Sequence, residues 1–88
     1  MSDQEAQVSW LALEEGMPVY AEGGEEIGKV AEIVADAQKD IFSGIAFKTG
    51  LLSHRRFAPA AVIGSLTAKG VHLNVAESEA HELEPYEG

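Results

Sequence analysis

Apolar and polar residues alternate with a period of two in the clearest part of the chain. Residues 71–75 read Val-His-Leu-Asn-Val, and a strand places alternate side chains on opposite faces of a sheet. Residues 65–67 form a second short run, and Ala68-Lys69-Gly70 lies between the two. This pattern predicts a β-hairpin with Gly70 in the left-handed conformation and with His72 facing outward.

The first half of the chain shows two further runs. Residues 27–35 are rich in Ile and Val and predict a strand. Before it, the alternation of Leu11, Leu13, Met17 and Val19, interrupted by Gly16 and Pro18, predicts an entry segment that leads into a short edge strand. Gly23-Gly24 separates the two runs, and glycine tolerates the positive φ angles of hairpin turns. We therefore predict a hairpin here.

The middle of the chain predicts a turn, a strand and a loop in that order. Residues 36–40 are polar and predict the turn, and residues 41–47 predict a strand in which Gly44 marks a bulge or bend. Residues 49–56 have no clear period and predict a loop. Residues 57–59 return to an extended conformation.

The two ends complete the prediction. Residues 1–8 lack apolar periodicity and predict a disordered tail ahead of a single domain over residues 9–88. Residues 77–83 predict a turn or two of helix, which Pro85 ends, and Tyr86 can fold back onto the domain. The fold class is all-β: a small barrel of five or six short antiparallel strands with a short C-terminal helical turn.

The order of these segments resembles the PRC-barrel family. The residues that carry the resemblance are 16–20 (Gly-Met-Pro-Val-Tyr), 24–30 (Gly-Glu-Glu-Ile-Gly-Lys-Val), 45–47, 56–62, 70–73 and Pro85-Tyr86. The resemblance covers nearly the whole chain and implies a non-catalytic adaptor domain that docks on protein partners and can self-associate. This chain departs from the better-known members of the family in that we expect it to be a free-standing single domain. It supplies no shared catalytic residue.

Composition narrows the chemistry. The 88 residues include no cysteine, which excludes disulfides, thiolate nucleophiles and cysteine metal sites. No stretch has the composition of a signal peptide or transmembrane helix, so we expect a cytoplasmic protein without membrane insertion. The net charge of −9 disfavours broad nucleic-acid binding.

Charge is segregated along the chain. Residues 1–40 and 77–88 carry all fifteen acidic residues, whereas residues 41–76 carry Lys48, Arg55, Arg56 and Lys69 and no acid. Folding can cancel this contrast by placing acidic ends beside the basic middle, which is the interpretation we favour. The alternative is a functional basic surface.

Three local patterns suggest chemistry but are better explained by structure. Residues 23–30 approach a phosphate-binding loop, yet two glutamates lie inside it and Val30 replaces the magnesium-binding hydroxyl. Glu77 and His81 share a helical face but offer only two metal ligands. Ser53 and His54 are adjacent, and no acid lies nearby in the sequence to orient the imidazole. We expect no enzyme activity, no metal and no cofactor.

The most suggestive segment is Leu51-Leu52-Ser53-His54-Arg55-Arg56. Paired leucines beside cations resemble an interface anchor with a charged rim, although leucines can also plug the end of a barrel. We predict an interaction site at Leu51, Leu52, His54, Arg55 and Arg56, used for a protein partner or a homodimer. The alternative is a small-ligand or RNA-binding barrel that uses the basic segment 48–69.

Overall fold

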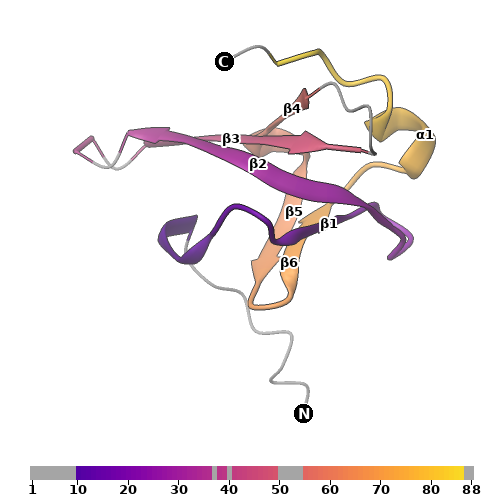
Figure 1. Ribbon diagram of the computed structural model, residues 1–88, viewed down its shortest axis with the longest axis horizontal. Helices are drawn as coiled ribbons and strands as arrows, with labels where there is room; N and C mark the ends of the chain where they lie inside the picture. Colours follow the sequence, from indigo (N-terminus) through magenta and orange to yellow (C-terminus); the bar gives the residue numbers. More distant parts are fainter. Residues whose placement is uncertain (1–9, 37, 40, 50–54, 87–88) are drawn as a thin grey trace.

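The computed structural model describes residues 10–36, 38–39, 41–49 and 55–86; the predicted tail over residues 1–8 lies outside these ranges. Within these ranges the elements are two 3-10 turns, six strands and one helical turn (Figure 1). In chain order they are η2 (Trp10–Ala12), β1 (Pro18–Tyr20), β2 (Glu26–Asp36), β3 (Ile41–Lys48), β4 (Arg55–Pro59), η3 (Ala60–Val62), β5 (Ile63–Thr67), β6 (Gly70–Leu73) and α1 (Glu77–Ala80).

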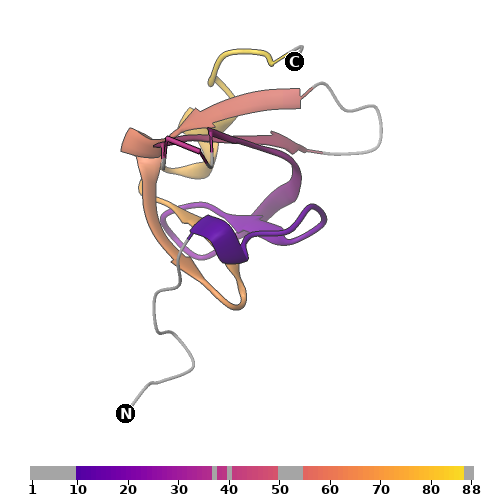
Figure 2. The ribbon, with the colours of Figure 1, turned by 90° about the vertical axis from the view of Figure 1, so that its left-hand side faces the viewer.

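The six strands form one mixed sheet in the order β4-β3-β2-β1-β6-β5. The sheet is strongly curved, and η3 joins β4 and β5, the strands at its two ends, directly in sequence (Figure 2). This arrangement confirms the predicted all-β fold.

Strand β1 corrects two details of the prediction. It lies inside the sheet, between β2 and β6, and not at an edge. Its pairing with β6 is parallel, with Val19 opposite Val71, so the sheet is not wholly antiparallel. Gly70 allows this approach, because a Cβ at that position would lie only 2.3 Å from the carbonyl oxygen of Pro18.

The predicted hairpins are confirmed. The β1–β2 loop turns at Gly24, which has a φ of 94°, and the backbone N–H of Gly24 donates to the carbonyl oxygen of Ala21. The β5–β6 turn passes through residues 68 and 69 to Gly70, whose φ is 146°. At the β2–β3 turn, the carboxylate of Asp36 accepts hydrogen bonds from the backbone N–H groups of residues 38 and 39.

Two glycines let neighbouring strands approach β3 closely. Gly44 has a φ of 150° and lies beside a register shift between β2 and β3. A Cβ at this position would lie only 2.2 Å from the carbonyl oxygen of Ala58 in β4. This confirms the predicted bulge. A Cβ at Gly28 of β2 would likewise lie only 2.1 Å from the carbonyl oxygen of Lys48, so no side chain fits there.

The core lies on the concave side of the curved sheet. Its largest fully buried side chains are Phe47, Ile45, Val19 and Val71. Alternation was predicted for residues 71–75, and β6 contains the part up to Leu73, in which Val71 and Leu73 are buried and His72 is half-buried. Trp10 closes part of the core by stacking on Phe42 with ring centroids 5.7 Å apart.

The C-terminal segment, residues 83–86, covers the outer edge of β4. The backbone N–H of Phe57 donates to the carbonyl oxygen of Glu84, and the N–H of Tyr86 donates to that of Arg55, both at 2.8 Å. Tyr86 therefore folds back onto the sheet after Pro85, and the ribbon that follows α1 runs back past β4 (Figure 1). This covers backbone groups that an edge strand otherwise leaves open to pairing with another chain.

Candidate functional site

The predicted interaction segment is only partly described. Leu51, Leu52 and His54 lie outside the described residues. Arg55 and Arg56 were predicted in a loop, which is wrong, because they begin β4 and pair with Lys48 and Phe47 of β3. Successive side chains of a strand point to opposite faces, so the two arginines have different surroundings.

Arg56 lies on the face of β4 that carries buried Phe47 as its cross-strand partner. Its guanidinium Nη1 donates a hydrogen bond of 2.8 Å to the carbonyl oxygen of Leu83. This contact holds the C-terminal segment against the sheet. Arg56 is therefore engaged within the molecule.

Arg55 lies on the other, outward face and joins two more cations. It is directly opposite Lys48 of β3, which is directly opposite Lys29 of β2. We call these three side chains the cationic row. All three are exposed, with 59 % of the Lys29 side chain and 42 % of the Arg55 side chain accessible to solvent.

Among the described residues, carboxylates form ion pairs only with the two ends of the cationic row, Lys29 and Arg55. Glu26 pairs with Lys29 at 2.8 Å, and Glu32 lies 3.9 Å from Arg55. The hydrogen bond and charge of Glu26 raise the pKa of Lys29 above its ordinary value of 10.5. Within the described ranges Lys48, in the middle, has no carboxylate within ion-pair distance.

Glu32 also receives a contact from the C-terminal segment. The hydroxyl of Tyr86 donates to Glu32 Oε2 at 3.1 Å, and the Tyr86 ring stacks on Phe57. Burial, followed by the hydrogen bond to Glu32, raises the pKa of Tyr86 above its ordinary value of 10.0. The cationic row and the covered edge of β4 thus adjoin each other at Glu32 and Arg55.

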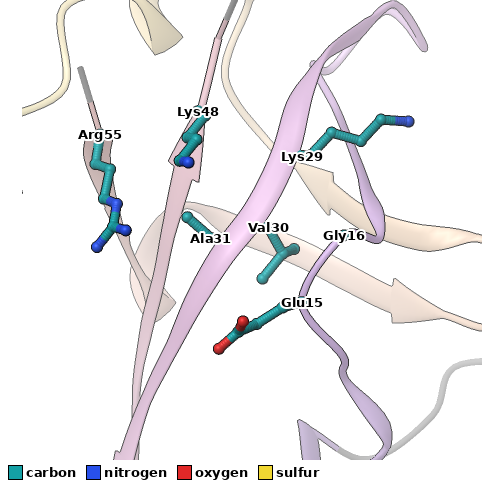
Figure 3. Close-up of a pocket in the computed structure, with 7 residues that line it drawn as sticks. All are labelled: Glu15, Gly16, Lys29, Val30, Ala31, Lys48 and Arg55. Carbon is teal, nitrogen blue, oxygen red and sulfur yellow. The ribbon is translucent and has the colours of Figure 1, made fainter. Parts of the chain in front are cut away.

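A surface hollow of about 430 Å³ lies beside the cationic row. It is lined by Glu15, Gly16, Lys29, Val30, Ala31, Lys48 and Arg55 (Figure 3). In this view Lys48 and Arg55 extend on one side of β2, whereas the ammonium group of Lys29 points away on the other. The hollow is open and polar, and it carries charges of both signs.

The described cations of the basic segment 48–69 do not share one surface. Lys48 and Arg55 share the outward face of β3 and β4, but Arg56 lies on the opposite face. Lys69 is on the β5–β6 turn, which both ribbon views place away from β3 and β4 (Figures 1 and 2). Folding also brings Glu32 from the acidic first part to Arg55, so the charge contrast of the sequence is partly cancelled, as we expected.

A second polar cluster lies on β1 and β6. Tyr20 stacks on His72 with ring centroids 5.0 Å apart, and Nε2 of His72 is 3.0 Å from Oγ1 of Thr67. Thr67 is buried, and its Oγ1 also accepts a hydrogen bond from the backbone N–H of Lys69. These contacts fix the β5–β6 turn, so they give His72 a structural role that its outward position alone does not show.

Two of the other suggestive patterns lie in the described part of the chain. Residues 23–30 form the β1–β2 turn and the start of β2, without the helix that a phosphate-binding loop needs. Glu77, the first residue of α1, and His81, which caps its end, lie close together, with Oε2 of Glu77 3.7 Å from Nε2 of His81. No cluster of three or more potential metal ligands occurs among the described residues, and Ser53 and His54 lie outside them.

The sequence alone missed Lys29 and Glu15 as neighbours of Lys48 and Arg55. Both belong to the acidic first part of the chain, so counting charge by segment hid them. The register that aligns Lys29 with Lys48 could have been suggested by Gly28, because a glycine in a strand often marks a close approach of backbones.

Comparison with known proteins agrees with the architecture. No curated protein matches the chain, and within the described ranges no helix has the length and apolar character needed to cross a bilayer. Residues 15–79 match the model of the PRC-barrel domain. This region runs from the residue before Gly16 into α1 and includes all six strands, so the chain belongs to the PRC-barrel family.

Proposed function

We propose that this chain is a non-catalytic interaction module that binds an acidic segment of a protein partner through the cationic row. The observation that carries the proposal is the position of Lys48, which lies in direct register between Lys29 and Arg55 and has no described carboxylate partner. The predicted contacts Leu51, Leu52 and His54 belong to the connection between Lys48 and Arg55.

The cationic row costs the free protein some stability. Like charges directly opposite each other on neighbouring strands destabilise a sheet, and this applies here to Lys48 and Arg55, because the ammonium group of Lys29 points away from them (Figure 3). Glu26 and Glu32 offset this cost at the ends of the row, but neither pairs with Lys48. A carboxylate supplied by a partner would relieve the repulsion at Lys48, which favours an acidic ligand over a basic one.

The predicted loop residues complete the proposed interface. Charged side chains set the rate and specificity of association, whereas apolar anchors supply most of the affinity. We propose that Leu51 and Leu52 provide the apolar contact and that Lys48 and Arg55 form the charged rim. Arg56 is left out of the partner contact, because its guanidinium is bound to Leu83.

The test compares two charge reversals in tagged full-length protein. Lys48→Glu acts in the middle of the cationic row, and the matched control Lys69→Glu makes the same change on the β5–β6 turn. Partners captured by the wild type are identified by mass spectrometry, and the affinity of each purified partner is then measured at 50 and 500 mM salt. We expect Lys48→Glu to weaken a salt-sensitive complex at least tenfold and Lys69→Glu to leave it unchanged.

Leu51→Ser with Leu52→Ser tests the apolar part of the same interface. The double variant should lower the affinity of the same partner while the circular dichroism spectrum stays that of the wild type. Equal loss of binding with both charge reversals, or no loss with any variant, would contradict the proposed surface. A change in the solution mass of the chain itself would identify a second copy as the partner.

The alternative function, a small-ligand or RNA-binding barrel that uses residues 48–69, has less support. An RNA strand would need several cations on one accessible surface, and here Arg56 and Lys69 are separated from Lys48 and Arg55. Titration of single-stranded RNA at 50 mM salt tests it. Binding in the low micromolar range that is lost with Lys48→Glu would favour this alternative.

A further inference from the structure

The edge of β4 binds the C-terminal segment as it would bind a separate peptide strand. The backbone N–H of Phe57 donates to the carbonyl oxygen of Glu84, and the N–H of Tyr86 donates to that of Arg55. Arg56 and Pro85 lie opposite each other as an antiparallel bridge. Main-chain pairing of this kind gives affinity for an extended segment, whereas side-chain contacts give specificity.

Side chains make the pairing specific at several positions. The guanidinium of Arg56 donates to the carbonyl oxygen of Leu83 at 2.8 Å. The Tyr86 ring stacks on Phe57 with centroids 5.9 Å apart, and its hydroxyl donates to Glu32 at 3.1 Å. The site therefore recognises an aromatic ring with a hydroxyl group at one defined position.

Proline fits the position before that tyrosine. Residues 84 and 86 direct their hydrogen-bonding groups toward β4, so the intervening residue directs its nitrogen away from the strand. Pro85 lacks an N–H and loses no hydrogen bond there. Its fixed φ also reduces the entropy lost when the segment becomes extended.

Charge adds to the recognition. The segment brings Glu82 and Glu84 to a strand that begins with Arg55 and Arg56, and both glutamates are exposed. This part of β4 is therefore complementary to acidic sequences. It adjoins the cationic row through Arg55 but uses a different surface, the edge of the sheet.

The attachment of the segment is short. Two backbone hydrogen bonds to β4, the contact with Arg56, the contacts of Tyr86 and the packing of half-buried Leu83 against the core hold it. Segments held by few contacts open locally at low free-energy cost. We propose that the β4 edge is a recognition site for an extended acidic segment containing Pro-Tyr, which residues 83–86 occupy until such a segment of a partner protein displaces them.

This proposal rests on the proposed function in assuming a protein partner, but it does not require the cationic row. In this proposal Arg56 takes part in recognition, because the partner segment would replace the C-terminal segment that Arg56 contacts in the structure. The C-terminal segment acts as an internal competitor, and its local concentration reduces the apparent affinity for any external segment.

The experiment uses full-length protein and a fluorescent peptide with the sequence of residues 82–88. Tyr86→Ala in the protein weakens the internal competitor, so this variant should bind the peptide at least tenfold more tightly than the wild type does in fluorescence anisotropy. Tyr20→Ala is the matched control, because Tyr20 contacts His72 and not the β4 edge. A peptide with alanine in place of its tyrosine should bind neither protein.

Two further variants keep the result interpretable. Tyr86→Phe retains the ring and removes the contact with Glu32, so it should improve peptide binding by a smaller factor than Tyr86→Ala does. This variant provides the test if Tyr86→Ala does not fold. Arg56→Gln combined with Tyr86→Ala should reduce the gain, because the contact with the carbonyl oxygen of residue 83 is lost.

Failure of the peptide to bind folded Tyr86→Ala protein at millimolar concentration would overturn the inference and leave docking at the cationic row intact. Dimers of the wild-type chain that dissociate when peptide is added would overturn the assignment to a partner protein. In that case a second copy of the chain would be the occupant. Loss of partner binding in Lys48→Glu alone would bear only on the cationic row.

Discussion

Gly28 is the position at which a single methyl group should disturb the fold most directly. In Gly28→Ala the new Cβ would lie 2.1 Å from the carbonyl oxygen of Lys48, whereas ordinary contact begins at 3.4 Å. The contact is about 1.3 Å too short, and the atom that it involves belongs to the backbone, which cannot rotate away as a side chain can. Strand β3 must therefore move away from β2, or β2 must twist.

The cost can be worked out from three contributions. Overpacking of a tight contact costs about 1–3 kcal/mol, and weakening one or two hydrogen bonds of the β2–β3 ladder costs about 1 kcal/mol each. Replacing glycine by alanine stiffens the unfolded chain, which returns about 0.4–1 kcal/mol. Together these contributions give a net loss of about 1–5 kcal/mol in the free energy of unfolding, with a central value of about 3 kcal/mol.

Urea denaturation followed by circular dichroism measures this loss. Gly23→Ala is the control, since its Cβ would meet only the carboxylate end of the flexible Glu25 side chain, at 2.8 Å. The control should stay within about 0.5 kcal/mol of the wild type. If Gly28→Ala is also within that range, the close approach of β3 to β2 does not constrain this position and the reasoning is refuted.

Three other changes test separate contacts. Thr67→Val removes the buried hydroxyl that bonds His72 and should lower the free energy of unfolding by about 1–2 kcal/mol in urea denaturation. Lys48→Gln removes like-charge repulsion and should raise stability by a few tenths of a kcal/mol at 10 mM salt but not at 500 mM, as the same assay at both salt concentrations will show. The raised pKa of Tyr86 means that its hydroxyl group holds the proton more tightly in the folded state than in the unfolded state. The stability that the protonated hydroxyl contributes is therefore complete below pH 10 and is lost as the pH rises through the folded-state pKa. Tyr86→Phe should therefore lose less stability than the wild type between pH 9.5 and 11 in thermal melts; an equal fall in both proteins would contradict the hydrogen bond to Glu32.

Local sequence predicted the hairpins because their determinants are local. Glycine at positions 24 and 70 supplies the positive φ angles that each turn needs, and the alternation of residues 71–73 follows from the strand geometry itself. Gly44 was predicted as a bulge for the same reason. No longer-range information is required at these positions.

Strand neighbours could not be predicted in this way. The placement of β1 between β2 and β6 depends on contacts between residues far apart in the chain, such as Val19 and Val71. Arg55 and Arg56 were placed in a loop because charged residues interrupt the apolar pattern, although one of them pairs with Lys48 on an exposed face and the other bonds a backbone carbonyl. Their pairing partners, and not their own polarity, decide their structure.

The cationic row was equally hidden. Its members come from three strands, and their alignment depends on the register of both the β2–β3 and β3–β4 pairs. A register shift of one residue would turn every side chain of a strand to the other face. Sequence could thus supply the candidates Lys48 and Arg55, but not Lys29 as their neighbour.

The parallel pairing of β1 and β6 also bears on how the protein folds. The strand closest to the start of the domain bonds the last strand made, so the sheet cannot be completed until synthesis has passed Leu73. Contacts between distant residues require a large loop to close first, and such topologies fold slowly. During this interval β2, β3 and β4 can pair in sequence while β1 lacks one neighbour, and the nascent chain is most exposed to wrong pairing with another molecule at that stage.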